Sequence, residues 1–115
     1  MSRPLFLYGT LLRPAVLRRF GGQPRRLRPA RAEGWLRVGL RGTPYPTLLR
    51  GAGTVAGALL RVPPAVLARL HAYEGPPYRL VPLRVAGAPG PCWARAWVAP
   101  PWRAARQAWH SPPPG

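Results

Sequence analysis

The stretch PLFLYGTLL, residues 4–12, contains the segment that decides the first element of the fold. Its opening part, residues 4–8, is a compact run of apolar and aromatic side chains, which predicts a buried first strand. Gly9 and Thr10 stop this run. A glycine directly after a strand predicts a tight turn whose backbone amides are open to a ligand. The chain is therefore expected to begin with a buried strand that leads into a candidate binding turn.

Five more strands and two helices are predicted from the pattern that follows. The strands are expected at residues 33–40, 47–50, 54–62, 78–85 and 92–99. One helix is expected within residues 12–20, where Pro14 suits a first turn, and the other extends from Pro63 to a stop at Gly75. Six strands and two short helices predict an α+β fold.

Length and composition predict one globular domain with a short tail. A chain of 115 residues can close a single hydrophobic core, and 47% of these residues are hydrophobic. The domain is expected to span residues 1–99, and residues 100–115 form a tail rich in Pro, Trp and Arg. This tail is expected either to hold one short helix that lays its tryptophans on the domain or to fray.

The charge of the chain is strongly positive. Eighteen arginines oppose two glutamates, which gives a formal net charge of +16, and Lys, Asn, Ile and Asp are absent. The joint loss of Lys, Asn and Ile indicates a nucleotide-composition bias toward codons such as those of Arg, so much of the charge need not serve a partner. A field of this size still favours anionic substrates over cationic ones.

One arginine-rich segment raises the question of nucleic acid. Residues 21–31, GGQPRRLRPAR, form a loop by composition and, together with Arg18 and Arg19, hold six arginines within fourteen residues, called the arginine arm below. Aromatic side chains for base stacking are not interleaved in this loop. We therefore expect a solvated arm that attracts nucleic acid only through non-specific charge.

Cysteine usage and the N-terminal segment favour a cytoplasmic protein. Cys92 has no partner for an intrachain disulfide, and neither it nor the two histidines are clustered with metal-ligand spacing. The first apolar run is too short for a signal sequence, and no segment approaches the roughly 20 apolar residues of a membrane span. We expect a soluble cytoplasmic chain with no membrane partner and no need of a metal or an organic cofactor.

Glu74 lies in the stretch LHAYEGPPYRL, residues 70–80, between a predicted helix end and a glycine. The partial negative charge of a helix C-terminus and burial beside Tyr73 and Tyr78 would both raise the pKa of this carboxyl group. Arg79 and the positive field of the chain would lower that pKa. Glu74 is therefore either an acid/base group poised near neutral pH or a surface residue paired with an arginine.

Several segments, taken in order, resemble the gamma-glutamylcyclotransferase-like family. They are LFLYGTLLRP at 5–14, YPTL at 45–48, TVAGALL at 54–60, LHAYEG at 70–75 and YRLVPLRV at 78–85. The resemblance covers residues 5–98 and implies a small, mostly antiparallel β-barrel with two flanking helices and a cavity at one mouth. Members of this family cleave gamma-glutamyl amides: the α-amine of the substrate attacks its own side-chain carbonyl, which releases an amine and 5-oxoproline.

The resemblance also implies roles for individual residues. The turn at Tyr8, Gly9, Thr10 and Leu11 matches the family's substrate loop, whose backbone amides hold the glutamyl group. Glu74 matches the family's general acid/base. The implied partner is a small anionic gamma-glutamyl substrate, whose leaving amine the sequence leaves open.

Two positions depart from the family pattern. His71 stands where an aspartate is frequent, and Trp97 stands where a tyrosine is common in the last predicted strand. His71 is expected on the exposed side of its helix, and Trp97 is expected to change the shape of the pocket. Glu33, the other carboxylate, precedes a predicted strand and is expected to pair with an arginine.

Two alternatives to an enzyme remain open. One is a nucleic-acid-binding module that uses the arginine arm. The other keeps the fold without the reaction, so that the pocket binds an acidic metabolite or a protein end.

Overall fold

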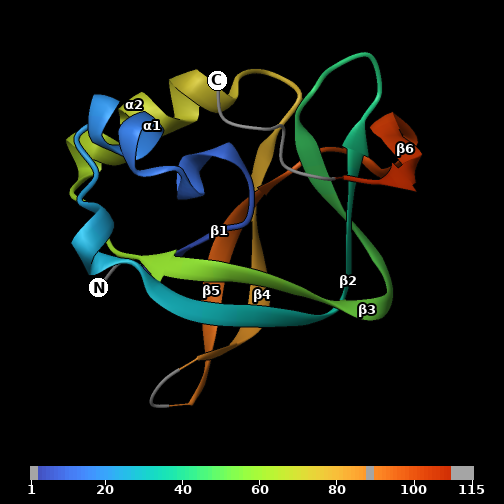
Figure 1. Ribbon diagram of the computed structural model, residues 1–115, viewed down its shortest axis with the longest axis horizontal. Helices are drawn as coiled ribbons and strands as arrows, with labels where there is room; N and C mark the ends of the chain where they lie inside the picture. The colour runs from blue at the N-terminus through green and yellow to red at the C-terminus, as the bar shows by residue number, and fades with distance from the viewer. Residues whose placement is uncertain (1–2, 88–89, 110–115) are drawn as a thin grey trace.

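The computed structural model describes residues 3–87 and 90–109 (Figure 1). Within them lie six strands and two α-helices. In chain order these are β1 (Leu5–Leu7), α1 (Pro14–Arg19), β2 (Arg28–Leu40), β3 (Pro46–Leu60), α2 (Pro64–Glu74), β4 (Arg79–Gly87), β5 (Pro91–Val98) and β6 (Ala104–Ala108). Short 3-10 turns lie at Thr10–Leu12, Pro24–Arg26 and Pro101–Arg103.

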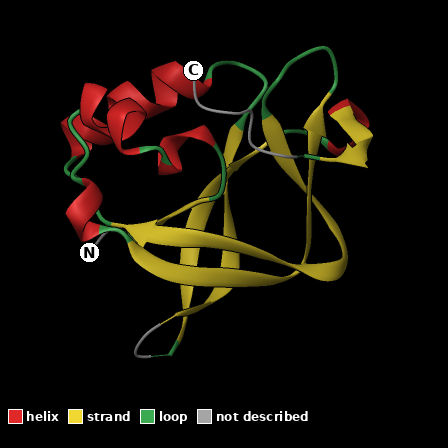
Figure 2. Ribbon diagram, in the orientation of Figure 1, coloured by secondary structure: helices red, strands yellow, loops and turns green. Residues whose placement is uncertain are grey.

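Five of the strands close a barrel. Their order is β3-β1-β5-β4-β2, and β2 pairs again with β3, which completes the ring. The β1–β5 pair is parallel and the others are antiparallel. Figure 2 shows the two α-helices on one side of the barrel, whereas the 3-10 turn before β6 lies on the other side. β6 pairs with β2 outside the ring. The α+β barrel with two flanking helices is thus confirmed. No helix among residues 3–87 and 90–109 has the length and apolar character needed to cross a membrane.

β1 is buried on both of its faces. Phe6 and Tyr8 belong to an apolar cluster that draws residues from all five barrel strands and fills the barrel. Leu5 and Leu7 belong to a second cluster, which packs the outside of the barrel against the helices. Each residue of β1 is at most 2% exposed. The buried first strand predicted from its continuous apolar run is confirmed.

α2 forms within the predicted boundaries and ends at the predicted glycine. Val66 and Leu70, four residues apart and therefore on one face, are buried against the barrel. Gly75 has a φ of 83°, a left-handed conformation that glycine adopts without strain, and its N–H donates to the His71 carbonyl at 3.1 Å. Glu74 is thereby the last residue of the helix.

β2 and β3 are longer than the sequence pattern indicated. The two segments expected at residues 47–50 and 54–62 form one strand, although Gly51 and Gly53 lie between them. The Leu36 side chain of β2 covers both glycines, so that a Cβ at either position would lie 2.6 Å from it. Cross-strand packing therefore replaces the side chains that the glycines lack. β2 begins at Arg28, inside the arginine arm, because it pairs with β3 from that residue onward.

The segment after Pro100 adopts a strand in place of the helix offered as one alternative. β6 pairs with the end of β2, with Ala104 opposite Leu40 and Ala108 opposite Val38. The free edge of β2 offers hydrogen-bond partners to residues 104–108, so pairing with a distant strand decides the conformation of this segment. Residues 110–115 of the expected tail lie outside the described residues.

The close contact between β1 and β3 generates a prediction about Gly57. A Cβ at Gly57 would lie 2.3 Å from the Leu7 carbonyl oxygen and 2.8 Å from the Phe6 ring. Gly57→Ala should therefore lower the free energy of unfolding by about 1–3 kcal/mol, as measured by urea denaturation. Gly39→Ala is the matched control on β2, because its Cβ would meet Ala105 at an ordinary 3.6 Å. Equal stability of the two variants would contradict the tight β1–β3 packing.

Candidate functional site

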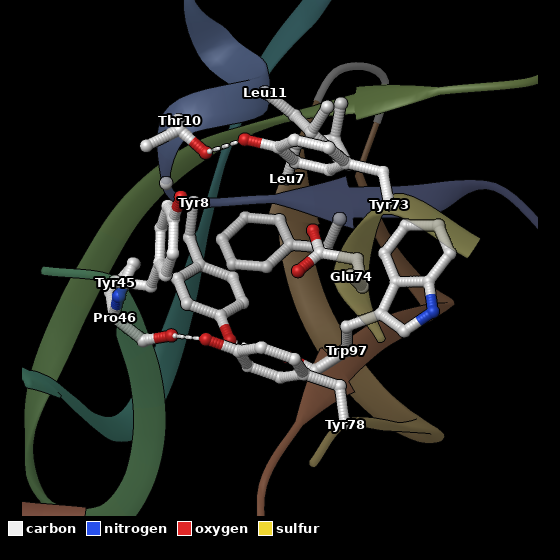
Figure 3. Close-up of a pocket in the computed structure, with 12 residues that line it drawn as sticks. Leu7, Tyr8, Thr10, Leu11, Tyr45, Pro46, Tyr73, Glu74, Tyr78 and Trp97 are labelled. Atoms are coloured by element: carbon white, nitrogen blue, oxygen red, sulfur yellow. Dashed lines mark hydrogen bonds between the residues drawn. The ribbon is translucent and has the colours of Figure 1, made fainter. Parts of the chain in front are cut away.

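A pocket of about 90 Å³ opens where β1 runs into its glycine turn (Figure 3). The lining is largely aromatic and comes from both ends of the sequence. It consists of Phe6, Leu7, Tyr8, Gly9, Thr10, Leu11, Tyr45, Pro46, Tyr73, Glu74, Tyr78 and Trp97. The four residues predicted as a substrate loop and the predicted acid/base residue therefore line one cavity. Glu33, exposed on β2, does not line it.

The turn at one side of the pocket presents backbone donors. The N–H groups of Leu12 and Arg13 donate to the carbonyls of Gly9 and Thr10, each at 3.0 Å, and this forms the 3-10 turn. The first amides of such a turn have no acceptor within it. Gly9 also permits close packing, because a Cβ there would lie 2.7 Å from the Pro46 side chain. The turn can therefore offer N–H groups to an anionic or carbonyl oxygen.

The Glu74 carboxylate lies among the aromatic rings of the pocket (Figure 3). Burial raises the pKa of this carboxyl group to about 7. The sequence left open whether burial would raise the pKa or the positive surroundings would lower it. In the structure burial dominates, because desolvation disfavours the charged carboxylate. Arg69 and Arg79, the two arginines nearest in sequence, are both exposed. Glu74 is thus a carboxyl group that can both accept and release a proton near neutral pH.

Two tyrosines hold the pocket walls together. The Tyr8 hydroxyl donates to the Trp97 carbonyl, and the Tyr78 hydroxyl donates to the Pro46 carbonyl at 2.6 Å. Burial raises the pKa of both phenols, with the nearby Glu74 adding to the effect. Both tyrosines therefore stay neutral and act as hydrogen-bond donors that join strands, which leaves Glu74 as the lining group that titrates near neutral pH.

The helix that carries Glu74 is tied directly to the glycine turn. Thr10 Oγ1 and the Tyr73 hydroxyl lie 3.0 Å apart across the pocket (Figure 3). The Tyr73 ring also packs against Phe20, with the ring centroids 4.7 Å apart. A side-chain hydrogen bond therefore links the candidate substrate loop to the helix residue that precedes Glu74.

The C-terminal segment supports the pocket wall that contains Tyr45. One of the two alternatives for this tail placed its tryptophans on the domain, and Trp109 does pack there, after a strand and not from a helix. Trp109 donates its indole N–H to the Pro44 carbonyl at 2.8 Å, which supports the loop that carries Tyr45. Arg37 packs over the Trp109 ring and donates to the Tyr8 carbonyl at 3.0 Å. These contacts depend on the pairing of β6 with β2, so no local motif could have revealed them.

The pKa of Glu74 predicts a pH-dependent stability. Burial favours the neutral carboxyl group in the folded chain. The contribution of Glu74 to the free energy of unfolding is therefore full below about pH 4.5 and is lost as the pH rises to about 7. Glu74→Gln stays neutral throughout. Its free energy of unfolding relative to the wild type should therefore rise over this window, by up to about 3 kcal/mol, in urea titrations at several pH values. Parallel curves for the two proteins would contradict the raised pKa, and Glu33→Gln serves as the exposed control.

Comparison with known proteins places these features in a family. The model of the family described as gamma-glutamyl cyclotransferase, AIG2-like, matches residues 5–112. The solved structure of At3g28950.1 from Arabidopsis thaliana is similar, with 27% identity, a TM-score of 0.73, and coverage of 86% of this chain and 62% of that one. At5g39720.1 from the same plant has 23% identity, a TM-score of 0.74, and coverage of 90% and 75%.

The fold extends to more distant sequences. YkqA from Bacillus subtilis shares 19% identity with a TM-score of 0.71, covering 97% of this chain but 44% of its own length. This chain thus spans less than two thirds of At3g28950.1 and of YkqA. No curated protein matches the chain. With the barrel, the glycine turn and the family match over residues 5–112 taken together, the chain belongs to the AIG2-like gamma-glutamyl cyclotransferase family.

Proposed function

We propose that this chain is an enzyme that cleaves a small gamma-glutamyl amide to 5-oxoproline and an amine, with Glu74 as general acid/base. The observation that carries the proposal is the Glu74 carboxyl group, whose pKa is about 7, in one small pocket with the donor turn at Tyr8 to Leu11. Family membership supports cyclotransferase chemistry in general. The pocket geometry supports the roles of these particular residues.

The proposed reaction uses one carboxyl group twice. The Glu74 carboxylate takes a proton from the α-ammonium of the substrate, and the freed amine attacks the side-chain carbonyl carbon to form a five-membered ring. The C–N bond to the leaving amine then breaks as protonated Glu74 delivers its proton to that nitrogen. The ring nitrogen still carries one extra proton after the attack, and the regenerated Glu74 carboxylate removes it and passes it to the released amine, which departs as an ammonium ion. Protons and bonds balance without an oxidant or a reductant, so no cofactor enters the scheme.

The protein's main task in this scheme is to fold the substrate. Nucleophile and carbonyl belong to one molecule, so correct orientation alone removes up to roughly 7–11 kcal/mol of the barrier. Backbone N–H groups of the turn at Gly9 suit the α-carboxylate or the developing oxyanion, where one good donor contributes about 3–4 kcal/mol. The ammonium group suits the other side of the pocket, beside Glu74 and the faces of Tyr73 and Tyr78.

The first test compares the chain's two carboxylates. Glu74→Gln should fold and lower kcat for 5-oxoproline release by about 100-fold or more, because the amide can neither accept nor deliver the proton. Glu33→Gln is the matched control and should retain activity, since Glu33 does not line the pocket. The measurement is mass-spectrometric detection of 5-oxoproline from a panel of gamma-glutamyl amino acids, amines and ε-lysine conjugates.

Two results would count against the proposal. Full activity of Glu74→Gln would remove Glu74 from the mechanism. If the folded wild type released no 5-oxoproline from any member of the panel, the same pocket would be favoured as a binding site for an acidic metabolite.

The activity of an active wild type should depend on pH. Its kcat/KM should fall about tenfold per pH unit below the Glu74 pKa of about 7, because the protonated group is no longer a base.

A second candidate function is the binding of single-stranded nucleic acid at the opposite end of β1. A groove of about 700 Å³ lies beside Pro4, with an apolar floor at Leu59 and Leu60. Its charged walls are Arg25, Arg26, Arg28 and Arg61. The arginine arm by itself lacks an aromatic ring for stacking. Trp93 follows the groove residue Cys92 in sequence and is 50% exposed, although it does not line the groove, and the guanidinium groups of Arg3 and Arg84 lie 5.9 and 6.0 Å from its ring centroid.

Matched charge removal separates a groove from a general positive field. The triple variant R25A/R26A/R28A and the control R79A/R103A/R106A, on exposed positions outside the groove, lose the same three charges. The groove variant should bind an oligonucleotide of about 20 nucleotides at least about tenfold more weakly than the control at about 150 mM salt, measured by fluorescence anisotropy. Equal affinities of the two triples would reduce this function to non-specific attraction.

A further inference from the structure

His71 and Trp97, which lie 26 residues apart in the chain, are in contact. The indole N–H of Trp97, on β5, donates to Nδ1 of His71, on α2, at 3.0 Å. Their ring centroids are 6.4 Å apart, and the ring planes are inclined by 36°. The sequence placed His71 on the exposed side of its helix, and its side chain is exposed. Exposure therefore did not exclude a specific contact with the pocket wall.

The Trp97 ring needs this acceptor. Trp97 is 2% exposed and lines the pocket, and an indole N–H can only donate. A buried donor without an acceptor loses its hydrogen bond to water and gains nothing in return. Nδ1 of His71 supplies the acceptor, so the imidazole carries its proton on Nε2. The Trp97 backbone is fixed as well, because its carbonyl accepts from the Tyr8 hydroxyl.

We propose that His71 is a positioning residue that holds the Trp97 indole as a fixed wall of the pocket. His71 and Glu74 lie three residues apart on α2 and therefore on neighbouring positions of one face. One turn of helix thus carries both the candidate acid/base group and the clamp on the wall beside it. The consequence for substrate binding rests on the proposed function, whereas the clamp itself does not.

The clamp requires an uncharged hydrogen-bond acceptor at the position that Nδ1 of His71 occupies, within reach of the Trp97 indole N–H. Oδ1 of asparagine stands at the same number of bonds from the backbone as Nδ1 of histidine, so His71→Asn keeps an acceptor near that point. His71→Leu fills similar space and removes the acceptor. Ala72→Asn, at the next and likewise exposed helix position, controls for the weaker helix propensity of asparagine.

The first measurement is the indole N–H signal of Trp97 in a ¹H–¹⁵N NMR spectrum. The chain has five tryptophans, and Trp97→Phe identifies the signal by its disappearance. His71→Leu should shift this signal and speed its exchange with solvent, while His71→Asn and Ala72→Asn should leave it close to its wild-type position. A Trp97 signal that His71→Leu does not change would overturn the clamp, whatever the activity of the protein.

The second measurement separates positioning from stability. A displaced wall weakens binding, so His71→Leu should raise KM about tenfold with less than about a threefold change in kcat, and His71→Asn should restore KM. Partial unfolding alone would lower the apparent kcat and leave KM unchanged, which would overturn the kinetic role. If the wild type cleaves no gamma-glutamyl amide, the proposed function fails, and the NMR signal still decides whether His71 holds Trp97.

Discussion

β1 is buried on both faces, and this burial sets where the neighbouring strands and the helices pack. Its alternate side chains enter two separate cores, one inside the barrel and one under the helices. A strand buried in this way cannot accommodate a polar side chain, nor a bulky side chain on the strand beside it. Gly57 of β3 accordingly leaves room for the Leu7 carbonyl and the Phe6 ring. Because β1 cannot shift, the turn at Gly9 emerges at a fixed place, and the pocket forms there.

A chain with a net charge of +16 keeps a carboxyl group that titrates near neutral pH because the two effects act over different ranges. Arginine charges at the surface are screened by water and salt within about 8–10 Å. Desolvation acts on Glu74 directly, since aromatic rings and a proline displace the water that would stabilise its charge. The pocket lining contains no arginine among the described residues. The local dry environment therefore decides the protonation of Glu74.

The pocket walls are joined by contacts between segments far apart in the chain. The Tyr8 hydroxyl donates to the Trp97 carbonyl, and the Tyr78 hydroxyl donates to the Pro46 carbonyl. The Trp109 indole donates to the carbonyl of Pro44, in the loop that precedes β3. Each hydrogen bond connects a different pair of strands or loops, so the pocket forms only when the barrel has closed. This arrangement explains why a segment as late as β6, which adds an outer strand to β2, contributes to the shape of a pocket that opens at the end of the first strand.

Elements whose signals are local were predictable from the sequence. A continuous apolar run gave the buried β1, and the proline start and glycine stop of α2 fixed Glu74 at its last residue. Features that depend on distant partners could not be predicted in this way. β6 forms because β2 has a free edge, and the pKa of Glu74 is raised because aromatic rings converge on it. His71 on α2 contacts Trp97 on β5. Hydrogen bonding at a sheet edge, desolvation and side-chain contacts across the fold are properties of proximity in space, which a local pattern does not encode.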